Sequence, residues 1–295
     1  MKTMIASVRG AVLVVAGVAL ATPAFAAGQA PHIERQQWSF AGPFGSYDEA
    51  QLQRGFKVFK EVCSSCHAAK FLAFRNLSQD GGLGYTDDQA KVIAAEYTVP
   101  KGVDDTGEPI EGPAVLSDHW PSPFPNEQAA RASNGGAYPP DFSTLAKARA
   151  GHSGFPLFIF DAFTQYQEQG PDYIYGLLTG YEEAPACFGE DFMGNYNTKF
   201  LGGSITFEAC KGETHLTGGP IGMAPPLSDE QVEYTDGTPM TVDQYSRDVA
   251  AFMMWMAEPK LEARKEMGFR VMIFLIVFAS LLYFTKKAIW RDVEH

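Results

Sequence analysis

The sequence predicts a mostly α-helical exported domain with long loops, followed by one C-terminal membrane-spanning helix. Three observations predict this architecture: apolar residues recur at helical spacing near both ends of the exported part, glycine and proline are frequent between them, and an apolar run lies near the C-terminus. Of the 295 residues, 29 are glycine and 19 are proline, and both interrupt regular structure. The hydrophobic share of 45% is typical of a folded chain.

The first helix is predicted from about residue 47 to about residue 66. It is preceded by Ser46 and Glu49, which have the Ser-x-x-Glu spacing of a capping box. Apolar side chains then recur on one helix face: Leu52, Phe56, Phe59 and Cys63.

A second amphipathic helix is predicted after Thr241 and Gln244, which again have capping-box spacing. Its apolar stripe consists of Val242, Tyr245, Val249, Phe252 and Met256. Pro259 ends or kinks it. Between the two helices, residues 171–181 suggest a short helix and residues 153–163 are apolar but ambiguous. Residues 79–145 are expected to form long loops with short helices.

The N-terminus has the features of a secretory signal peptide. Lys2 and Arg9 precede a short apolar run, and residues 24–26 form an Ala-x-Ala cleavage site. A first transmembrane helix is the alternative, but the run is too short to span. Removing residues 1–26 changes the net charge from −12 to −14, because two positive charges are lost. This acidity argues against nucleic-acid binding and suits a basic protein partner. The alternative, which the charge alone favours, is that it serves only solubility.

The apolar run near the C-terminus predicts a membrane anchor. Residues 271–285 are 15 uncharged residues, and extension back to Met267 gives 19 with the single charge of Arg270. An aromatic and basic border follows: Tyr283, Lys286, Lys287, Trp290 and Arg291. A buried core helix is the alternative. We therefore expect a signal peptide at 1–26, a periplasmic domain at 27–262, an anchor at 263–287 and a cytoplasmic tail at 288–295.

Cys63, Cys66 and His67 form a Cys-x-x-Cys-His motif, the attachment signature of a c-type haem. Two thiols three positions apart can each join one vinyl group, and the adjacent histidine can then ligate the iron. A zinc site would need two further ligands, and a thioredoxin-like pair would need a βαβ context. A disulfide within so short a loop would stabilise the fold little. The motif predicts a class I cytochrome c-like domain.

A low-spin electron carrier favours ligation of the iron by one histidine and one methionine. The residues alone leave several methionines as candidates for this second ligand. Met223 lies in a stiff loop that ends in two prolines, whereas Met193 lies in an acidic loop and Met240 near a helix start. The remaining mature methionines belong to the second amphipathic helix or the anchor. In an exported chain Cys187 and Cys210, 23 positions apart, are expected to form a disulfide worth about 3 kcal/mol.

Several motifs in one order resemble the cytochrome c1 family, the haem subunits of cytochrome bc1 complexes. The resemblance covers nearly all of the mature chain. It rests on Arg54-Gly55-Phe56 before the haem motif, Tyr138 to Ser143, Ala148-Arg149-Ala150, Asp172-Tyr173, Leu177 to Tyr181, Met223 to Pro226 and Ala257-Glu258-Pro259.

The resemblance implies that Cys63 and Cys66 hold one haem c and that His67 and Met223 are its axial ligands. A disulfide between Cys187 and Cys210 departs from the mitochondrial pattern and looks like that of some bacterial members.

Other residues gain a role only through the resemblance. It implies that Pro139 and Pro140 wall the haem pocket, that Arg149 approaches a propionate, and that Tyr173 lies near the haem. From the residues alone, Arg149 would be a solvated helix face and Tyr173 a core aromatic. Residues 151–170 look like an insertion of unassigned role.

The implied function is electron transfer within ubiquinol–cytochrome c oxidoreductase, with no acid–base catalytic residues in this chain. The partners implied are cytochrome b, a Rieske iron–sulfur protein as donor and a basic cytochrome c as acceptor, in a dimeric complex of the bacterial cytoplasmic membrane. Candidate acidic docking residues are Glu182, Glu183, Glu190 and Asp191. A haem subunit of another respiratory complex, a membrane-anchored shuttle and a haem peroxidase remain alternatives.

Overall fold

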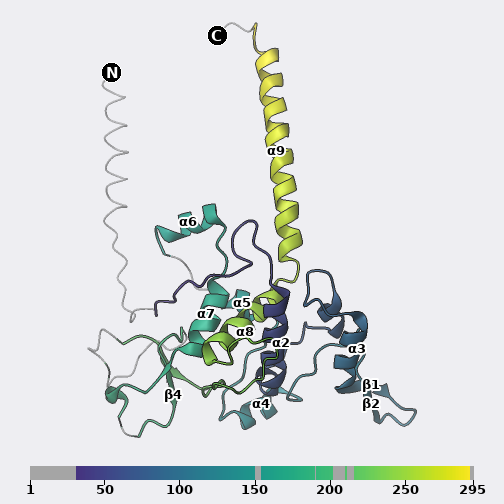
Figure 1. Ribbon diagram of the computed structural model, residues 1–295, viewed down its shortest axis with the longest axis vertical. Coiled ribbons are helices and arrows are strands. Elements are labelled where there is room, and N and C mark those ends of the chain that lie inside the picture. The colour runs from purple at the N-terminus through teal and green to yellow at the C-terminus, as the bar shows by residue number, and fades with distance from the viewer. Residues whose placement is uncertain (1–30, 150–153, 190, 202–209, 211–215, 293–295) are drawn as a thin grey trace.

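The computed structural model describes residues 31–149, 154–189, 191–201, 210 and 216–292. Its core contains the helices α2 (Glu49–Glu61), α7 (Gln169–Thr179) and α8 (Val242–Ala257), from which α9 (Leu261–Ile289) projects as a long separate helix (Figure 1). The prediction of a mostly helical domain with one C-terminal apolar helix is confirmed. The predicted signal peptide lies outside the described residues.

Helix α2 begins and ends differently from the prediction. Asp48, rather than Ser46, is its N-cap, and the Asp48 carboxylate accepts the Gln51 amide at 3.1 Å. Ser46 is unavailable because its own amide bonds to the Ser39 carbonyl at 3.1 Å, within the preceding loop. After Glu61 the chain tightens into the 3₁₀ turn η1 (Cys63–Ser65), so the predicted α-helix to residue 66 is wrong in its last turn.

Helices α2 and α8 cross in close contact at Gly55. A Cβ atom at this position would lie 2.0 Å from the Asp248 carbonyl oxygen, so only glycine fits. The buried Asp248 carboxylate accepts hydrogen bonds from Arg54 at 3.0 Å and from Tyr234 at 3.0 Å. Phe252 packs beside Phe56 and Phe59 of α2. The helix that leads into Cys63 is therefore fixed against the core.

Helix α8 matches its prediction more closely. The Thr241 side chain caps it by accepting the Gln244 amide at 3.3 Å, and the helix ends at Ala257, two residues before Pro259. Helix α7 packs on α8 and on the short α5 (Leu145–Ala148). The predicted boundaries of 171–181 for α7 are shifted by two residues, because the helix begins before Pro171.

The long segment between α2 and α5 contains more regular structure than predicted. It holds η2 (Phe74–Ser78), α3 (Asp87–Ala95), α4 (Glu127–Ser133) and an antiparallel pair of strands, β1 (Thr98–Val103) and β2 (Pro109–Pro113). The sequence did not predict this hairpin because nearly all its side chains are exposed, which leaves no alternating apolar pattern.

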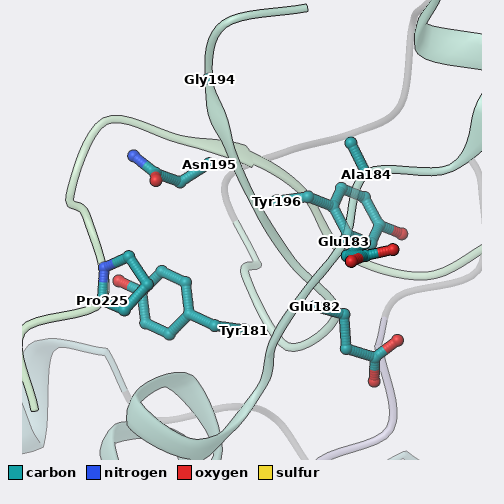
Figure 2. A pocket seen from close by; sticks show the side chains of 8 residues that line it. All are labelled: Tyr181, Glu182, Glu183, Ala184, Gly194, Asn195, Tyr196 and Pro225. Atoms are coloured by element: carbon teal, nitrogen blue, oxygen red, sulfur yellow. The ribbon is translucent and has the colours of Figure 1, made fainter. Parts of the chain in front are cut away.

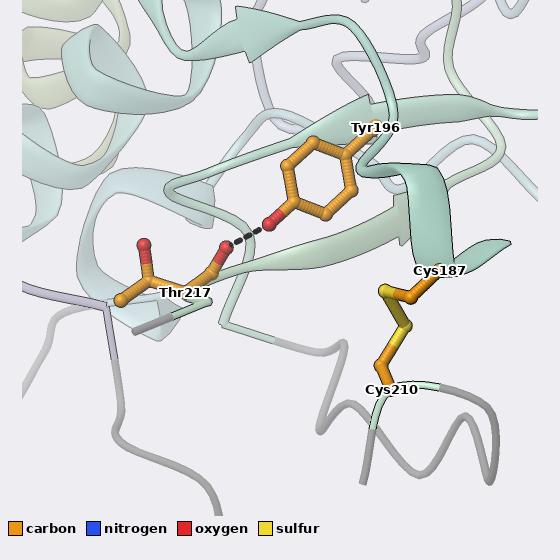
Figure 3. The surroundings of a disulfide bond; sticks show 4 residues. All are labelled: Cys187, Tyr196, Cys210 and Thr217. Carbon is orange, nitrogen blue, oxygen red and sulfur yellow. Dashed lines mark hydrogen bonds between the residues drawn. A yellow bond between two sulfur atoms is a disulfide. The ribbon is translucent and has the colours of Figure 1, made fainter. Parts of the chain in front are cut away.

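A small three-stranded antiparallel sheet lies near the end of α7. Its order is β3 (Tyr181–Glu182), β4 (Asn195–Asn197) and β5 (Gly219–Ile221), with the turn η3 (Ala186–Phe188) between β3 and β4. The predicted disulfide between Cys187 and Cys210 is present, with the Cα atoms 5.3 Å apart. Beside it, the Tyr196 hydroxyl donates to the Thr217 carbonyl at 2.5 Å (Figure 3). The Tyr196 bond ties β4 to Thr217, just before β5, the strand that leads to Met223.

Helix α9 is 29 residues long. It contains an 18-residue window of mean hydropathy 2.1 in which no residue is buried, so its length and composition suit a membrane span. Its first turn is attached tightly to the domain. Leu261 is buried, the Glu262 carboxylate accepts the Tyr47 amide at 2.8 Å, and the Lys265 ammonium donates to the Phe40 carbonyl at 2.6 Å.

The ambiguous stretch 153–163 contains one further short helix, α6 (Leu157–Thr164).

Candidate functional site

The two cysteines of the Cys-x-x-Cys-His motif lie on the turn directly after α2. Cys63 is half-buried and Cys66 is exposed, and both are free thiols rather than partners in a disulfide. Burial raises the pKa of the Cys63 thiol to about 12. A reactive redox pair depends on a lowered thiol pKa, so this environment argues against a thioredoxin-like role.

The imidazole of His67 is buried and held in one orientation. Its Nδ1 atom lies 2.8 Å from the Pro140 carbonyl oxygen. A carbonyl can only accept, so Nδ1 carries the proton and the lone pair of Nε2 is left available for a metal. The ring also stacks on Phe142, with centroids 4.1 Å apart. Burial lowers the pKa of His67, which favours the neutral form that ligates iron.

The segment that carries Pro139 and Pro140 runs beside the residues after the motif. The Phe142 amide donates to the Ala68 carbonyl at 2.8 Å, and the Lys70 amide donates to the Asp141 carboxylate at 3.1 Å. These bonds hold the Pro140 carbonyl against His67. The structure therefore brings Pro140, one of the two predicted prolines, next to the motif across 73 positions of sequence.

Met223 lies on a loop two residues after β5 and is partly buried. The Tyr181 hydroxyl donates to the Met223 carbonyl at 3.1 Å. A Cβ atom on the neighbouring Gly222 would lie 3.0 Å from the Ala137 side chain. The Met223 loop thus touches the start of the same segment that orients His67.

The other candidate methionines have different surroundings. Met193 is 95% exposed. Met240 packs partly against the core just before α8. Met253, Met254 and Met256 are buried in α8. Among the candidate methionines that the structure describes, Met223 is the one whose loop lies beside the segment that supports the motif.

Tyr173 is electrostatically coupled to Arg149 and to Tyr181. Tyr173 is buried on α7, and its hydroxyl accepts the Leu201 amide at 3.5 Å. Burial raises the pKa of Tyr173, and the positive charge of the exposed Arg149 lowers it. Burial likewise raises the pKa of Tyr181, and Tyr173 adds to that rise.

Tyr181 is the residue of this group that sequence reasoning did not identify as part of the site. It is the last residue of the family motif from Leu177 to Tyr181, and its bond to Met223 joins residues 42 positions apart. No local pattern in the sequence indicates such a contact.

An open cleft of about 380 Å³ adjoins Tyr181 and the Met223 loop (Figure 2). Its lining comes from the small sheet and from the loop after Met223: Tyr181, Glu182, Glu183, Ala184, Gly194, Asn195, Tyr196 and Pro225. Glu182 and Glu183 are exposed at this cleft. The predicted docking residue Glu190 lies outside the described residues.

The donor set fits a covalently attached haem. Two thiols occupy one turn, the imidazole has Nε2 free, and a thioether loop contacts the segment that orients this imidazole. Across the described ranges, no cluster of three or more His, Cys, Asp or Glu side chains is suited to a metal ion alone.

A helical domain with this site, joined to one apolar helix, defines a membrane-anchored c-type cytochrome. Residues 38–293 match the Cytochrome C1 family, and the chain belongs to that family. It is 46% identical to the cytochrome c1 of Blastochloris viridis over 94% of this chain and 92% of that protein, and 45% identical to that of Rhodospirillum rubrum over 89% of each. It is also 52% identical to the cytochrome b/c1 of Bradyrhizobium diazoefficiens over 87% of this chain, which spans only 35% of that longer protein.

Family membership confirms the family predicted from the sequence motifs. It also confirms the predicted function, a haem-carrying electron-transfer subunit of the cytochrome bc1 complex. The chain is thus a membrane-anchored member of an assembly that includes cytochrome b and a Rieske protein, with a covalently bound haem c.

Proposed function

We propose that the chain takes one electron from the Rieske iron–sulfur protein and passes it to a basic cytochrome c, using a haem held by Cys63, Cys66, His67 and Met223. The observation that carries the ligand assignment is the segment 137–142. It holds His67 through the Pro140 carbonyl at 2.8 Å and also contacts the loop of Met223. When bound, the haem supplies a one-electron redox couple at its iron.

The residues of this chain then have distinct tasks. Cys63 and Cys66 would hold the haem through thioether bonds, and His67 would offer Nε2 because Pro140 holds the proton on Nδ1. Met223 offers its thioether, and the Tyr181 hydroxyl holds the Met223 carbonyl in place.

Four residues complete the proposed pocket. Pro139 and Pro140 would wall it and exclude water. Tyr173 would lie near the haem, and Arg149 would pair with a propionate. The exposed position of Arg149 and its effect on the pKa of Tyr173 support this arrangement.

We also propose that the domain faces the periplasm of a bacterium and that the chain acts in a dimeric complex. The predicted signal peptide would export residues 27–262, and α9 would return residues 288–295 to the cytoplasm. A protease added outside spheroplasts should then cut the domain. If the domain stayed uncut in spheroplasts, whose outer membrane is open to the protease, the proposed orientation would be contradicted.

Purification of the tagged chain from membranes tests the proposed route. A cytochrome b and a Rieske protein should co-purify, and ubiquinol should reduce the haem c at a rate lost when the Rieske protein is removed. A purified chain that ubiquinol reduces equally fast without the Rieske protein would contradict the proposed donor.

The acidic rim of the cleft predicts how the acceptor docks. Changing Glu182 and Glu183 together to Gln removes two negative charges beside the Met223 loop, so reduction of a basic cytochrome c should slow several-fold at low salt. The difference should shrink as ionic strength rises, because charges are screened beyond about 8 Å at physiological salt. Stopped-flow reduction of the acceptor at several salt concentrations measures this.

The matched control removes two equally exposed charges from the β1–β2 hairpin, at Glu108 and Glu111. The hairpin lies at the opposite end of the domain from β4 (Figure 1). Equal slowing by the two double variants would show that only net charge matters and would reject a local docking site.

A further inference from the structure

Helix α6 has its polar and apolar sides reversed relative to a helix on a soluble protein. Its only charged residue, Asp161, is buried, whereas its large apolar side chains face outward. Phe163 is 83% exposed, and Phe155, just before the helix, is 82% exposed. The other exposed apolar side chains of this segment are Leu157, Phe158, Ile159 and Phe160. So large an exposed apolar patch marks a binding surface or a membrane contact.

The orientation of α6 is fixed by its buried carboxylate. Asp161 forms an ion pair with Arg35 at 2.7 Å and lies 3.4 Å from the Gln169 amide nitrogen. Arg35 also lies over the ring of Tyr166, 4.4 Å from its centroid. These contacts hold the polar side of α6 against the domain, so the phenylalanines are held outward.

The height of α6 relative to the membrane follows from the loop of residues 40–45. Gly42 lies close to Thr164, the last residue of α6: a Cβ atom at Gly42 would be 3.9 Å from the Thr164 carbonyl oxygen. At the other side of the loop, the ring of Phe44 meets Phe269 of α9 with centroids 5.9 Å apart. Phe269 lies at the beginning of the apolar span. The loop therefore joins α6 to the level at which α9 would enter the bilayer.

Figure 1 shows α6 on the side of the globular domain from which α9 projects. Phe44 is 81% exposed on the same side. We propose that α6 and Phe44 form a second membrane contact, in which the aromatic rings lie in the interfacial region of the bilayer that α9 spans. This proposal rests on α9 being a membrane span and is independent of the iron ligands.

A lipid surface fits these observations better than a protein partner does. A bilayer interface accepts aromatic rings without requiring a matching surface, and exposed phenylalanines on a short helix are typical of helices that lie in the membrane interface. The ion pair to Arg35 already satisfies the one charge of α6, so this helix presents no charged side chain outward for a protein partner to pair with. The contact would give the domain a fixed tilt, since α6 and α9 support it at two separate points.

Site-directed labelling of the whole complex in lipid nanodiscs tests the proposal. Single variants Phe158→Cys and Phe163→Cys each give this chain one thiol available for labelling, because two native cysteines are assigned to haem and two form a disulfide. The unsubstituted complex, labelled in parallel, gives the signal from thiols of the other subunits. An environment-sensitive fluorophore at each position is measured with and without phospholipid that carries a nitroxide near its headgroup. We expect at least two-fold stronger quenching than at the control Val103→Cys, which is 65% exposed on β1.

Each emission is compared with the same labelled protein in nitroxide-free lipid, so quenching by the haem cancels. An unchanged haem spectrum shows that each variant is folded. Quenching equal to that of the Val103 control would overturn the proposal. A label shielded from a water-soluble quencher yet unaffected by nitroxide lipid would also overturn it, because a protein subunit would then cover α6.

Discussion

Replacing Met223 with Leu is expected to remove the proposed second ligand of the iron. The substitution preserves side-chain volume, so packing changes little, at a cost below about 1.5 kcal/mol. The thioether is lost, and a soft neutral sulfur stabilises the reduced state. The reduction potential should fall by a sizeable part of the roughly 0.8 V range over which axial ligands set haem potentials. The reduced variant should bind carbon monoxide, which redox titration and optical spectra would detect.

Two other methionines serve as controls for this variant. Met193 is 95% exposed and Met240 packs beside the core, so Met193→Leu and Met240→Leu should leave the potential and the spectrum unchanged. Electron transfer from the Rieske protein should slow only in Met223→Leu, because the driving force decreases. If Met223→Leu kept the native potential while a control lost it, the ligand would be elsewhere. The covalent attachment would stand, because it depends on separate residues.

Replacing Cys63 and Cys66 together with Ala is expected to abolish covalent haem. Both thiols lie on the turn after α2, and no thioether can form once they are removed. On a denaturing gel the band of this chain should lose its haem stain completely. Removing the disulfide with Cys187→Ala and Cys210→Ala is the matched control, and stain on that band should remain. A stained band from the Cys63 and Cys66 variant would refute attachment at the motif.

Local patterns in the sequence predicted a large part of this molecule. The haem motif needs only five consecutive residues, and the anchor needs only an apolar run of sufficient length. The cap of α8 at Thr241 was likewise visible, because its partner lies three residues away. Each of these features is formed by residues that are close together in the sequence, so the local pattern is enough to predict the structure there.

Features that depend on distant contacts were not predictable in this way. The predicted capping box at Ser46 is absent because the Ser46 amide donates to the Ser39 carbonyl instead. Both residues belong to a loop that Lys265 of α9 holds through the Phe40 carbonyl. Similarly, the contact of His67 with the Pro140 carbonyl joins residues 73 positions apart, and no local pattern indicates it. The family resemblance suggested that both prolines line the site, and the structure adds how Pro140 acts on His67. The reversed polarity of α6 also required the fold, because a sequence of apolar residues around one Asp does not reveal which side faces the protein.

The junction between α8 and α9 also determines how this protein can meet its partners. Only three residues separate the helices, and the Lys265 ammonium bonds to the Phe40 and Gly45 carbonyls while Glu262 bonds to the Tyr47 amide. The Glu258 carboxylate pairs with Lys147 and Arg264 across the same joint. A connection so short and so heavily bonded cannot act as a swinging tether, so the redox centre stays at a constant height above the lipid. Any movement that brings the redox centres together must therefore come from the proteins that give and receive the electron.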